Sequence, residues 1–112
     1  MNTTQIGRQA EDIVANKLIS EGYVVIAQNW RNRFCEIDIV ASKQKTVYFI
    51  EVKYRKSSAW GDGLDSITSK KLKQMNFAAE FWINQNYWQG NAELLVAAVS
   101  GAPPKIDEII YL

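Results

Sequence analysis

The stretch EIDIVASKQKTVYFIEVKYR, residues 36–55, decides the fold. Two runs rich in β-branched and aromatic residues, at about 36–41 and 46–54, flank the polar sequence SKQK, and this pattern predicts an antiparallel hairpin. Successive side chains of a strand point to opposite faces, so Glu51 and Lys53 share one face of the second strand. Both faces of that strand are otherwise apolar. The two charges need an explanation, because burying an unpaired carboxylate or ammonium costs free energy.

A third charge, Asp38, lies in the middle of the first strand of this hairpin. If the strands pair around SKQK, Asp38 comes close to Glu51 across the ladder. Two carboxylates among apolar neighbours repel each other, and a divalent cation such as Mg²⁺ relieves that repulsion because it prefers carboxylate oxygens. Such a metal polarises a phosphoryl oxygen and lowers the pKa of a bound water, and Lys53 would orient that water or stabilise the charge that builds on the phosphate. The alternative is a structural salt-bridge cluster at the edge of the sheet.

The rest of the chain predicts two helices and three further strands around this hairpin. The predicted segments are a helix at 4–21, a strand at 23–28, a polar turn at 29–34, a loop at 55–65, a helix from 66 or 68 to about 85, and strands at 92–99 and 105–111. The buried stripe of the second helix is expected to contain Leu72, Met75, Ala78, Ala79, Trp82 and Ile83. The order α-β-β-β-α-β-β predicts one α/β domain over residues 1–112, with two or three layers.

Composition excludes several classes of site. The chain of 112 residues contains no histidine, which excludes Ser-His-Asp and Cys-His catalysis and His-ligated zinc. Cys35 is the single cysteine, so an internal disulfide is excluded, and a packing role is expected because no histidine activates the thiol. The N-terminal sequence lacks the apolar core of a signal peptide, and no apolar run has the length of a membrane span. A soluble cytoplasmic protein is expected.

Net charge is only +1, but the basic residues are unevenly distributed. Residues 30–56 hold seven basic and three acidic side chains, and residues 66–75 add three lysines and no acid. This asymmetry suits a face that binds a polyanion, although charge alone favours the simpler explanation, a solvated surface with chance clustering. Trp60 is a candidate for stacking on an unpaired base or for packing on the second helix. The candidates for phosphate contact are Arg31, Arg33, Arg55, Lys56, Lys70 and Lys71.

The arrangement of Asp38 and Glu51-Val52-Lys53 on consecutive strands resembles the catalytic core of the PD-(D/E)xK nuclease superfamily. A closer resemblance covers residues 7–83. The segments GRQAE, EGYVVIAQNWR, CEIDIVA, YFIEVKYR and SITSKK are similar to the YraN-like family of predicted endonucleases, which is itself similar to archaeal Holliday junction resolvases. The resemblance implies a restriction-endonuclease-like αβββαβ core in which helices flank a central mixed sheet.

The resemblance also implies roles for individual residues. Asp38, Glu51 and the Val52 carbonyl would bind Mg²⁺ or Mn²⁺, and Lys53 would be the catalytic lysine. Three further roles are implied by position in the family pattern: Glu11 would reach the metal site directly or through water, Glu36 would lie beside it, and Lys71 would contact phosphate. The similarity to junction resolvases, which are dimers, also implies a homodimer.

Two departures from the family pattern stand out. Cys35 replaces the glycine that usually precedes Glu-Ile-Asp, and Glu93, Leu94 and Leu95 stand where the family tends to have Arg-Phe-Asp.

From the charged residues of the hairpin and the resemblance together, the expected function is a metal-dependent endonuclease that hydrolyses DNA phosphodiester bonds in branched or single-stranded DNA. The alternatives are a nucleic-acid-binding module with weak or no catalysis, and a structural adaptor with a charged hairpin as its interaction surface.

Overall fold

The computed structural model of the chain describes residues 3–56 and 67–112. Its elements are α1 (Thr3–Ser20), β1 (Val24–Arg31), β2 (Glu36–Lys43), β3 (Thr46–Arg55), α2 (Ser69–Asn86), β4 (Asn91–Ser100) and β5 (Lys105–Tyr111). This order confirms the α-β-β-β-α-β-β succession predicted from the sequence. Trp60 and most of the predicted loop at 55–65 lie outside the described residues.

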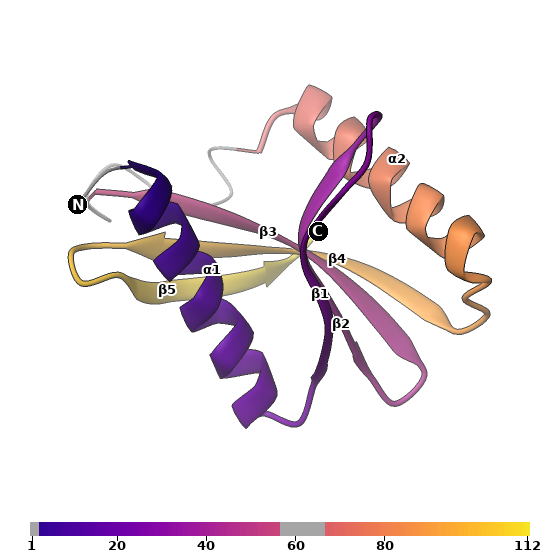
Figure 1. The fold of residues 1–112 in the computed structure, drawn as a ribbon, viewed down its shortest axis with the longest axis horizontal. Helices are drawn as coiled ribbons and strands as arrows, with labels where there is room; N and C mark the ends of the chain where they lie inside the picture. Colours follow the sequence, from indigo (N-terminus) through magenta and orange to yellow (C-terminus); the bar gives the residue numbers. More distant parts are fainter. Residues whose placement is uncertain (1–2, 57–66) are drawn as a thin grey trace.

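The five strands form one mixed sheet in which the spatial order equals the chain order (Figure 1). β1, β2 and β3 pair antiparallel, β3 and β4 pair parallel, and β4 and β5 pair antiparallel. The parallel pair requires a crossover, and α2 lies in the connection that supplies it. The expected αβββαβ core, a central mixed sheet flanked by helices, is confirmed.

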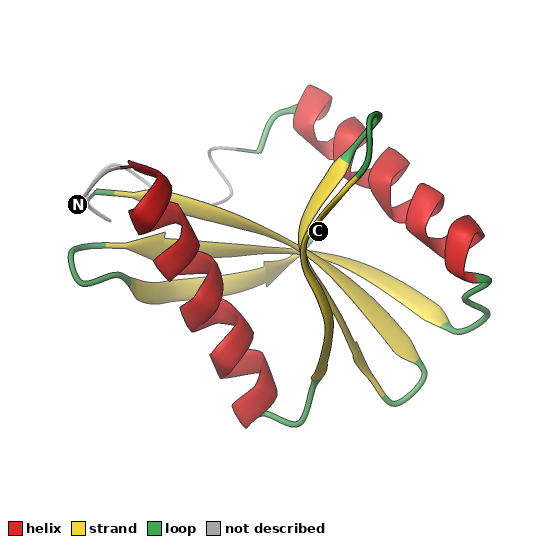
Figure 2. Ribbon diagram, in the orientation of Figure 1, coloured by secondary structure: helices red, strands yellow, loops and turns green. Residues whose placement is uncertain are grey.

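The two helices cover opposite faces of the sheet, so the protein has three layers (Figure 2). α1 buries Ala10, Val14, Ala15 and Leu18 in a cluster with sheet residues that include Ile39, Ile50 and Leu95. α2 buries Ala78, Ala79 and Trp82 in a second cluster with sheet residues that include Val40, Val47 and Phe49. β3 therefore supplies apolar side chains to both clusters, which is typical of a central strand that is covered on both faces.

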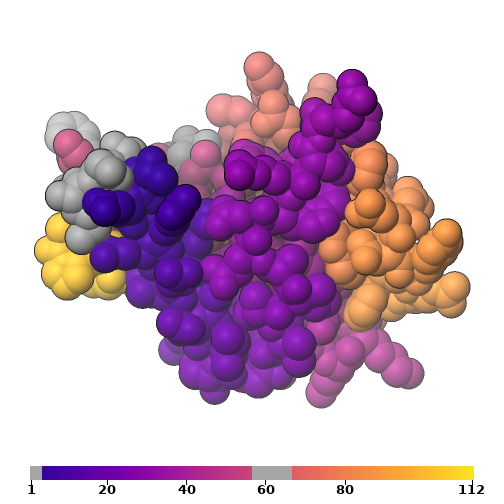
Figure 3. Space-filling view, in the orientation of Figure 1, coloured from indigo at the N-terminus to yellow at the C-terminus, as the bar shows by residue number. Residues whose placement is uncertain are grey.

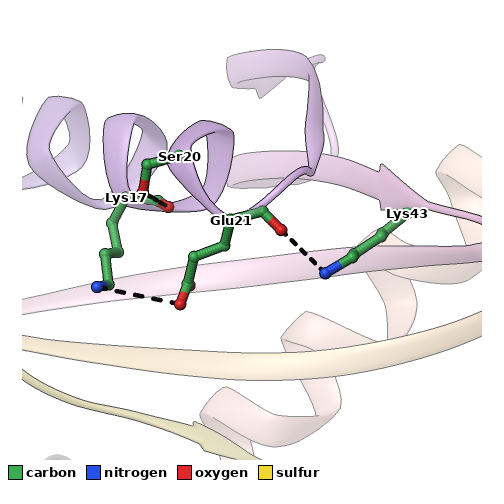
Figure 4. Close-up of polar contacts among 4 residues, drawn as sticks. All are labelled: Lys17, Ser20, Glu21 and Lys43. Carbon is green, nitrogen blue, oxygen red and sulfur yellow. Dashed lines mark hydrogen bonds and ion pairs between the residues drawn. The ribbon is translucent and has the colours of Figure 1, made fainter.

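Local chemistry fixes the ends of both helices. α1 stops before Gly22, whose φ of 93° is accessible to glycine at little cost. Figure 4 shows that Lys43, at the end of β2, donates a hydrogen bond of 2.9 Å to the Glu21 carbonyl. α2 begins after Thr68, whose side chain accepts a hydrogen bond from the Lys71 backbone N–H and so caps the helix. None of the described helices is both long and apolar enough to cross a membrane.

The predicted polar turn at 29–34 is wrong over its first half. β1 continues through Arg31, and Trp30 pairs with Ile37 on β2. The actual turn is shorter and is organised by Asn32, whose side-chain oxygen accepts hydrogen bonds from two backbone N–H groups that follow it. Such a turn requires only a few residues, and the pairing with β2 extends the preceding residues into the strand.

Candidate active site

Asp38 lies where β2 separates from β3. The antiparallel ladder between these strands extends from the turn to the pair Ile39 and Ile50 and stops there. Beyond that pair, the backbone N–H of Val52 donates a hydrogen bond of 2.8 Å to Asp38 Oδ2. A carboxylate thus satisfies a strand N–H that no longer has a partner in the β2 ladder. This hydrogen bond holds the Asp38 side chain in the opening between the two strands.

Asp38 and Glu51 lie close together, as predicted from their spacing around the turn. The pKa of Asp38 is raised to about 7, chiefly by burial and then by the charge of the neighbouring Glu51 carboxylate, with a smaller contribution from a hydrogen bond with Glu51. The Val52 N–H opposes this rise because it stabilises the ionised form. Near neutral pH, Asp38 is therefore only partly ionised, because its charge is unfavourable in this buried position beside Glu51.

Glu11 approaches the carboxylate pair from α1. Burial raises its pKa, the hydrogen bond from Asn29 lowers it, and the charges of nearby carboxylates, including Glu36 and Glu51, raise it. Its Oε2 atom is buried and has no hydrogen-bond partner. The structure thus places Glu11 and Glu36 near the pair, as the sequence resemblance implies. Within residues 3–56 and 67–112, no group of three or more Asp, Glu, His or Cys side chains has the arrangement of a metal site.

Two lysines accompany Glu51. The Lys71 ammonium, from the first turn of α2, lies 3.2 Å from Glu51 Oε2, and the Glu51 side chain is only 14% exposed. Lys71 therefore neutralises the carboxylate and connects α2 to the sheet. Lys53 is half-buried and lies two residues along β3, in a stretch that pairs regularly with β4. This regular pairing puts Lys53 on the same face as Glu51.

A cleft of about 780 Å³ extends from Glu51 along α2. The β1–β2 turn, which projects beside α2 in Figure 3, forms its other wall. Arg55 and Lys56, two of the predicted phosphate contacts, are not part of the described lining. The lining consists of Arg31, Asn32, Arg33, Phe34, Cys35, Glu36, Glu51, Lys70, Lys71, Lys73, Gln74, Met75 and Phe77. The cleft thus joins four of the six predicted phosphate contacts to a member of the carboxylate pair.

Sequence reasoning missed an aromatic strip made of Phe34, Phe77 and Phe81. The ring of Phe81 lies 6.1 Å from that of Phe34 and 6.3 Å from that of Phe77, measured between centroids. A signal was present in the sequence, because Phe77 and Phe81 are four residues apart and both fall outside the predicted buried stripe of α2. Lys73 is a further cation of the cleft that is not among the predicted phosphate contacts, although it lies in the basic run of residues 66–75.

Cys35 is a packing residue in this structure. It is half-buried against the cluster under α2, and its thiol donates a weak hydrogen bond to the Asn32 side chain at 3.6 Å. Burial raises the pKa of the thiol, so the reactive thiolate is disfavoured. The Cys35 side chain therefore adds a contact to the turn that forms one wall of the cleft.

Known proteins with similar sequences define the family. The model of the family described as "Uncharacterised protein family UPF0102" matches residues 10–109. A UPF0102 protein of Fusobacterium nucleatum is 38% identical over 89 residues, which are 80% of this chain and 75% of that protein. A UPF0102 protein of Caldicellulosiruptor bescii is 41% identical over 83 residues, which are 74% of this chain and 70% of that protein. This match confirms the YraN-like part of the predicted resemblance, and the chain belongs to the UPF0102 family.

Proposed function

We propose that the protein is a metal-dependent endonuclease that hydrolyses DNA phosphodiester bonds. The observation that carries the proposal is the carboxylate pair of Asp38 and Glu51, held beside a half-buried lysine at the end of a basic cleft. The arrangement agrees with the resemblance to PD-(D/E)xK nucleases, in which these residue types occupy consecutive strands.

Although no three acidic side chains of the described residues are arranged as a metal site, two of them, Asp38 and Glu51, would form the core of a site for a divalent cation. Asp38 and Glu51 provide adjacent carboxylate oxygens, and the buried Glu11 Oε2 has no other partner. The Val52 carbonyl is a third candidate ligand, because the carbonyl and the N–H of a strand residue face the same neighbour, and this N–H faces Asp38. Carboxylate and carbonyl oxygens suit Mg²⁺ or Mn²⁺. When bound, such a cation polarises a phosphoryl oxygen and lowers the pKa of a bound water.

The lysines of the site have separate tasks in this proposal. Lys53, on the face of β3 that carries Glu51, stabilises the negative charge that develops on the phosphate. Lys71 neutralises Glu51 in the absence of a cation. If a bound cation took the place of Lys71 at that carboxylate, the Lys71 ammonium would be free to contact a phosphate oxygen in the same cleft.

The test is cleavage of labelled single-stranded, flap and junction DNA in Mg²⁺, Mn²⁺ or EDTA. Glu51→Gln and Lys53→Ala are each expected to lower the rate by roughly 100-fold or more, because Glu51 would hold the metal and Lys53 would stabilise the charge on the reacting phosphate. The matched control is Glu80→Gln, which alters an exposed carboxylate of α2 that is not part of the described cleft lining. Cleavage that survives Glu51→Gln would indicate a contaminating nuclease.

A second candidate function is nucleic-acid binding without catalysis. The Lys71–Glu51 ion pair favours it, because that pair compensates the carboxylate without any metal. The two candidates differ in metal binding. A metal-dependent enzyme is expected to unfold at a higher temperature in Mn²⁺, and Glu51→Gln is expected to abolish that increase. A binding module would show salt-sensitive DNA binding, no cleavage and no stabilisation by Mn²⁺.

A further inference from the structure

The aromatic strip joins the two walls of the cleft. Phe34 lies on the β1–β2 turn, whereas Phe77 and Phe81 lie one helical turn apart on α2. The Phe81 ring contacts both outer rings and also that of Trp30, at 6.2 Å between centroids. Trp30 itself packs against the core cluster under α2. The strip is therefore anchored to the hydrophobic core through Trp30.

The outer rings of the strip are exposed to solvent. Phe34 is 64% exposed and Phe77 is 52% exposed. α2 already buries Met75, Ala78, Ala79 and Trp82, so these two phenylalanines are not needed to hold the helix on the sheet. Adjacent exposed aromatic rings on two different elements are typical of a binding surface.

The charges around the strip indicate what it binds. Arg31, Arg33, Lys70 and Lys73 line the same cleft, and none of the four forms an ion pair with another described residue. The Arg33 guanidinium lies 5.3 Å from the centre of the Phe34 ring. Cations hold phosphates, and exposed aromatic rings stack on bases whose faces are not already covered by a complementary strand. A purely apolar partner would leave these four cations without a counterpart.

We propose that Phe34 and Phe77, supported from behind by Phe81, bind unpaired bases, so that the cleft accepts single-stranded DNA or the unpaired strand of a branched substrate in preference to a continuous duplex. The inference rests on the proposed nuclease function, because it takes DNA as the substrate and refines its class. Glu51 lines the cleft together with Phe34 and Phe77, so a strand stacked on the rings has its phosphates beside the carboxylate pair.

Binding measured in EDTA tests the inference without requiring cleavage. The probes are a labelled oligothymidylate of about 16 nucleotides and a blunt duplex of the same length, followed by fluorescence anisotropy. The double variant Phe34→Ala and Phe77→Ala is expected to bind the single strand about tenfold or more weakly, since each stacked base contributes substantially to affinity. Its affinity for the duplex is expected to stay unchanged, and Phe34→Tyr with Phe77→Tyr is expected to retain single-strand binding.

Two controls separate stacking from other effects. Tyr87→Asn removes an aromatic ring that is 85% exposed at the far end of α2, and asparagine tolerates the positive φ of that position. It is expected to leave both affinities unchanged. Arg33→Ala is expected to weaken the binding of both probes to the same extent, because single-stranded and duplex DNA both offer phosphates for contact. Far-UV circular dichroism and the unfolding temperature check that the variants are folded.

The outcomes distinguish this inference from the nuclease proposal. Equal loss of affinity for both probes in the alanine double variant, or no loss for either, would overturn the aromatic strip as a base-binding surface, even if the protein cleaves DNA. Selective loss for the single strand supports it, even if no condition produces cleavage.

Discussion

Asp38 makes the stability of the protein depend on pH. Its pKa is about 7 in the folded chain and 3.8 for an unperturbed aspartate. Between these two values the folded protein binds more protons than the unfolded one. The free energy of unfolding therefore falls as pH rises through this window, and the loss is complete above about pH 7, where it reaches the order of a few kcal/mol.

Asp38→Asn removes the titrating group and keeps an oxygen that can accept the Val52 N–H. We expect this variant to be more stable than the parent protein at about pH 8, and to lose little stability between about pH 5 and pH 8. Urea unfolding in EDTA at the two pH values measures both quantities. A variant less stable than the parent at the higher pH would contradict this expectation. It would mean that the stabilisation from the hydrogen bond between the charged carboxylate and Val52 exceeds the cost of burying that charge.

The sequence predicts part of this site. Because residues on either side of a short turn pair in order, the proximity of Asp38 and Glu51 follows from their positions. The end of the β2–β3 ladder at Ile39 and Ile50 does not follow, since it depends on how the two strands diverge. The ion pair of Lys71 with Glu51 also requires the docked position of α2, which sequence periodicity does not specify.

At the scale of elements, the turn between α2 and β4 packs against the turn between β2 and β3. A Cβ atom added at Gly90 would overlap the Lys45 carbonyl, which accepts a hydrogen bond from the Asn91 N–H at 2.7 Å. Gly90→Ala must displace backbone, so we expect it to lower the free energy of unfolding by roughly 1–3 kcal/mol. Chemical denaturation measures the change.

Gly7→Ala is the matched control for this substitution. Gly7 lies within α1, and an added Cβ would meet no atom within 4 Å. Alanine is favoured over glycine in a helix, so we expect Gly7→Ala to raise the free energy of unfolding by about 0.5–1 kcal/mol. A similar loss of stability in both variants would contradict the close approach of the two turns.

The sequence predicts best those elements whose conformation is determined by residues close in the chain. The apolar spacing of α1 and α2 and the alternation in β2 and β3 are local, and these elements are confirmed. The position at which β1 ends depends instead on its pairing with another strand. Asn29, Trp30 and Arg31 have the composition of a turn, but pairing with β2 keeps them in the strand. The aromatic strip was missed because one of its rings comes from a turn and the others from a helix.

For the whole molecule, the unequal distribution of charge predicts salt-dependent binding of nucleic acid. Four cations of the cleft, Arg31, Arg33, Lys70 and Lys73, form no ion pair with another described residue. If each neutralises one phosphate of a single strand, the logarithm of the binding constant should fall with that of the salt concentration with a slope of about −3. Anisotropy titrations over a range of salt concentrations measure this slope.

Substitutions of lysines inside and outside the cleft test whether the cleft causes this salt dependence. Lys70→Ala and Lys73→Ala together are expected to reduce its magnitude by about half, because two phosphate contacts are lost. Lys45→Ala, which removes an exposed cation from the β2–β3 turn, is expected to leave it unchanged. An equal reduction in both cases would indicate diffuse attraction by the whole surface.

The parallel pairing of β3 with β4 has a consequence for the order of folding. β1, β2 and β3 are joined by short turns, as are β4 and β5, so each set forms through contacts that are close in the chain. The pairing of β3 with β4 joins residues 46–55 to residues 91–100, and closing such a long segment costs more entropy than closing a turn. We therefore expect the two sets to form early and their union across β3 and β4 to limit the folding rate. Asp38 and Glu51 both belong to the first set of strands. We therefore expect the repulsion between their carboxylates to arise before α2 packs on the sheet and brings Lys71 to Glu51.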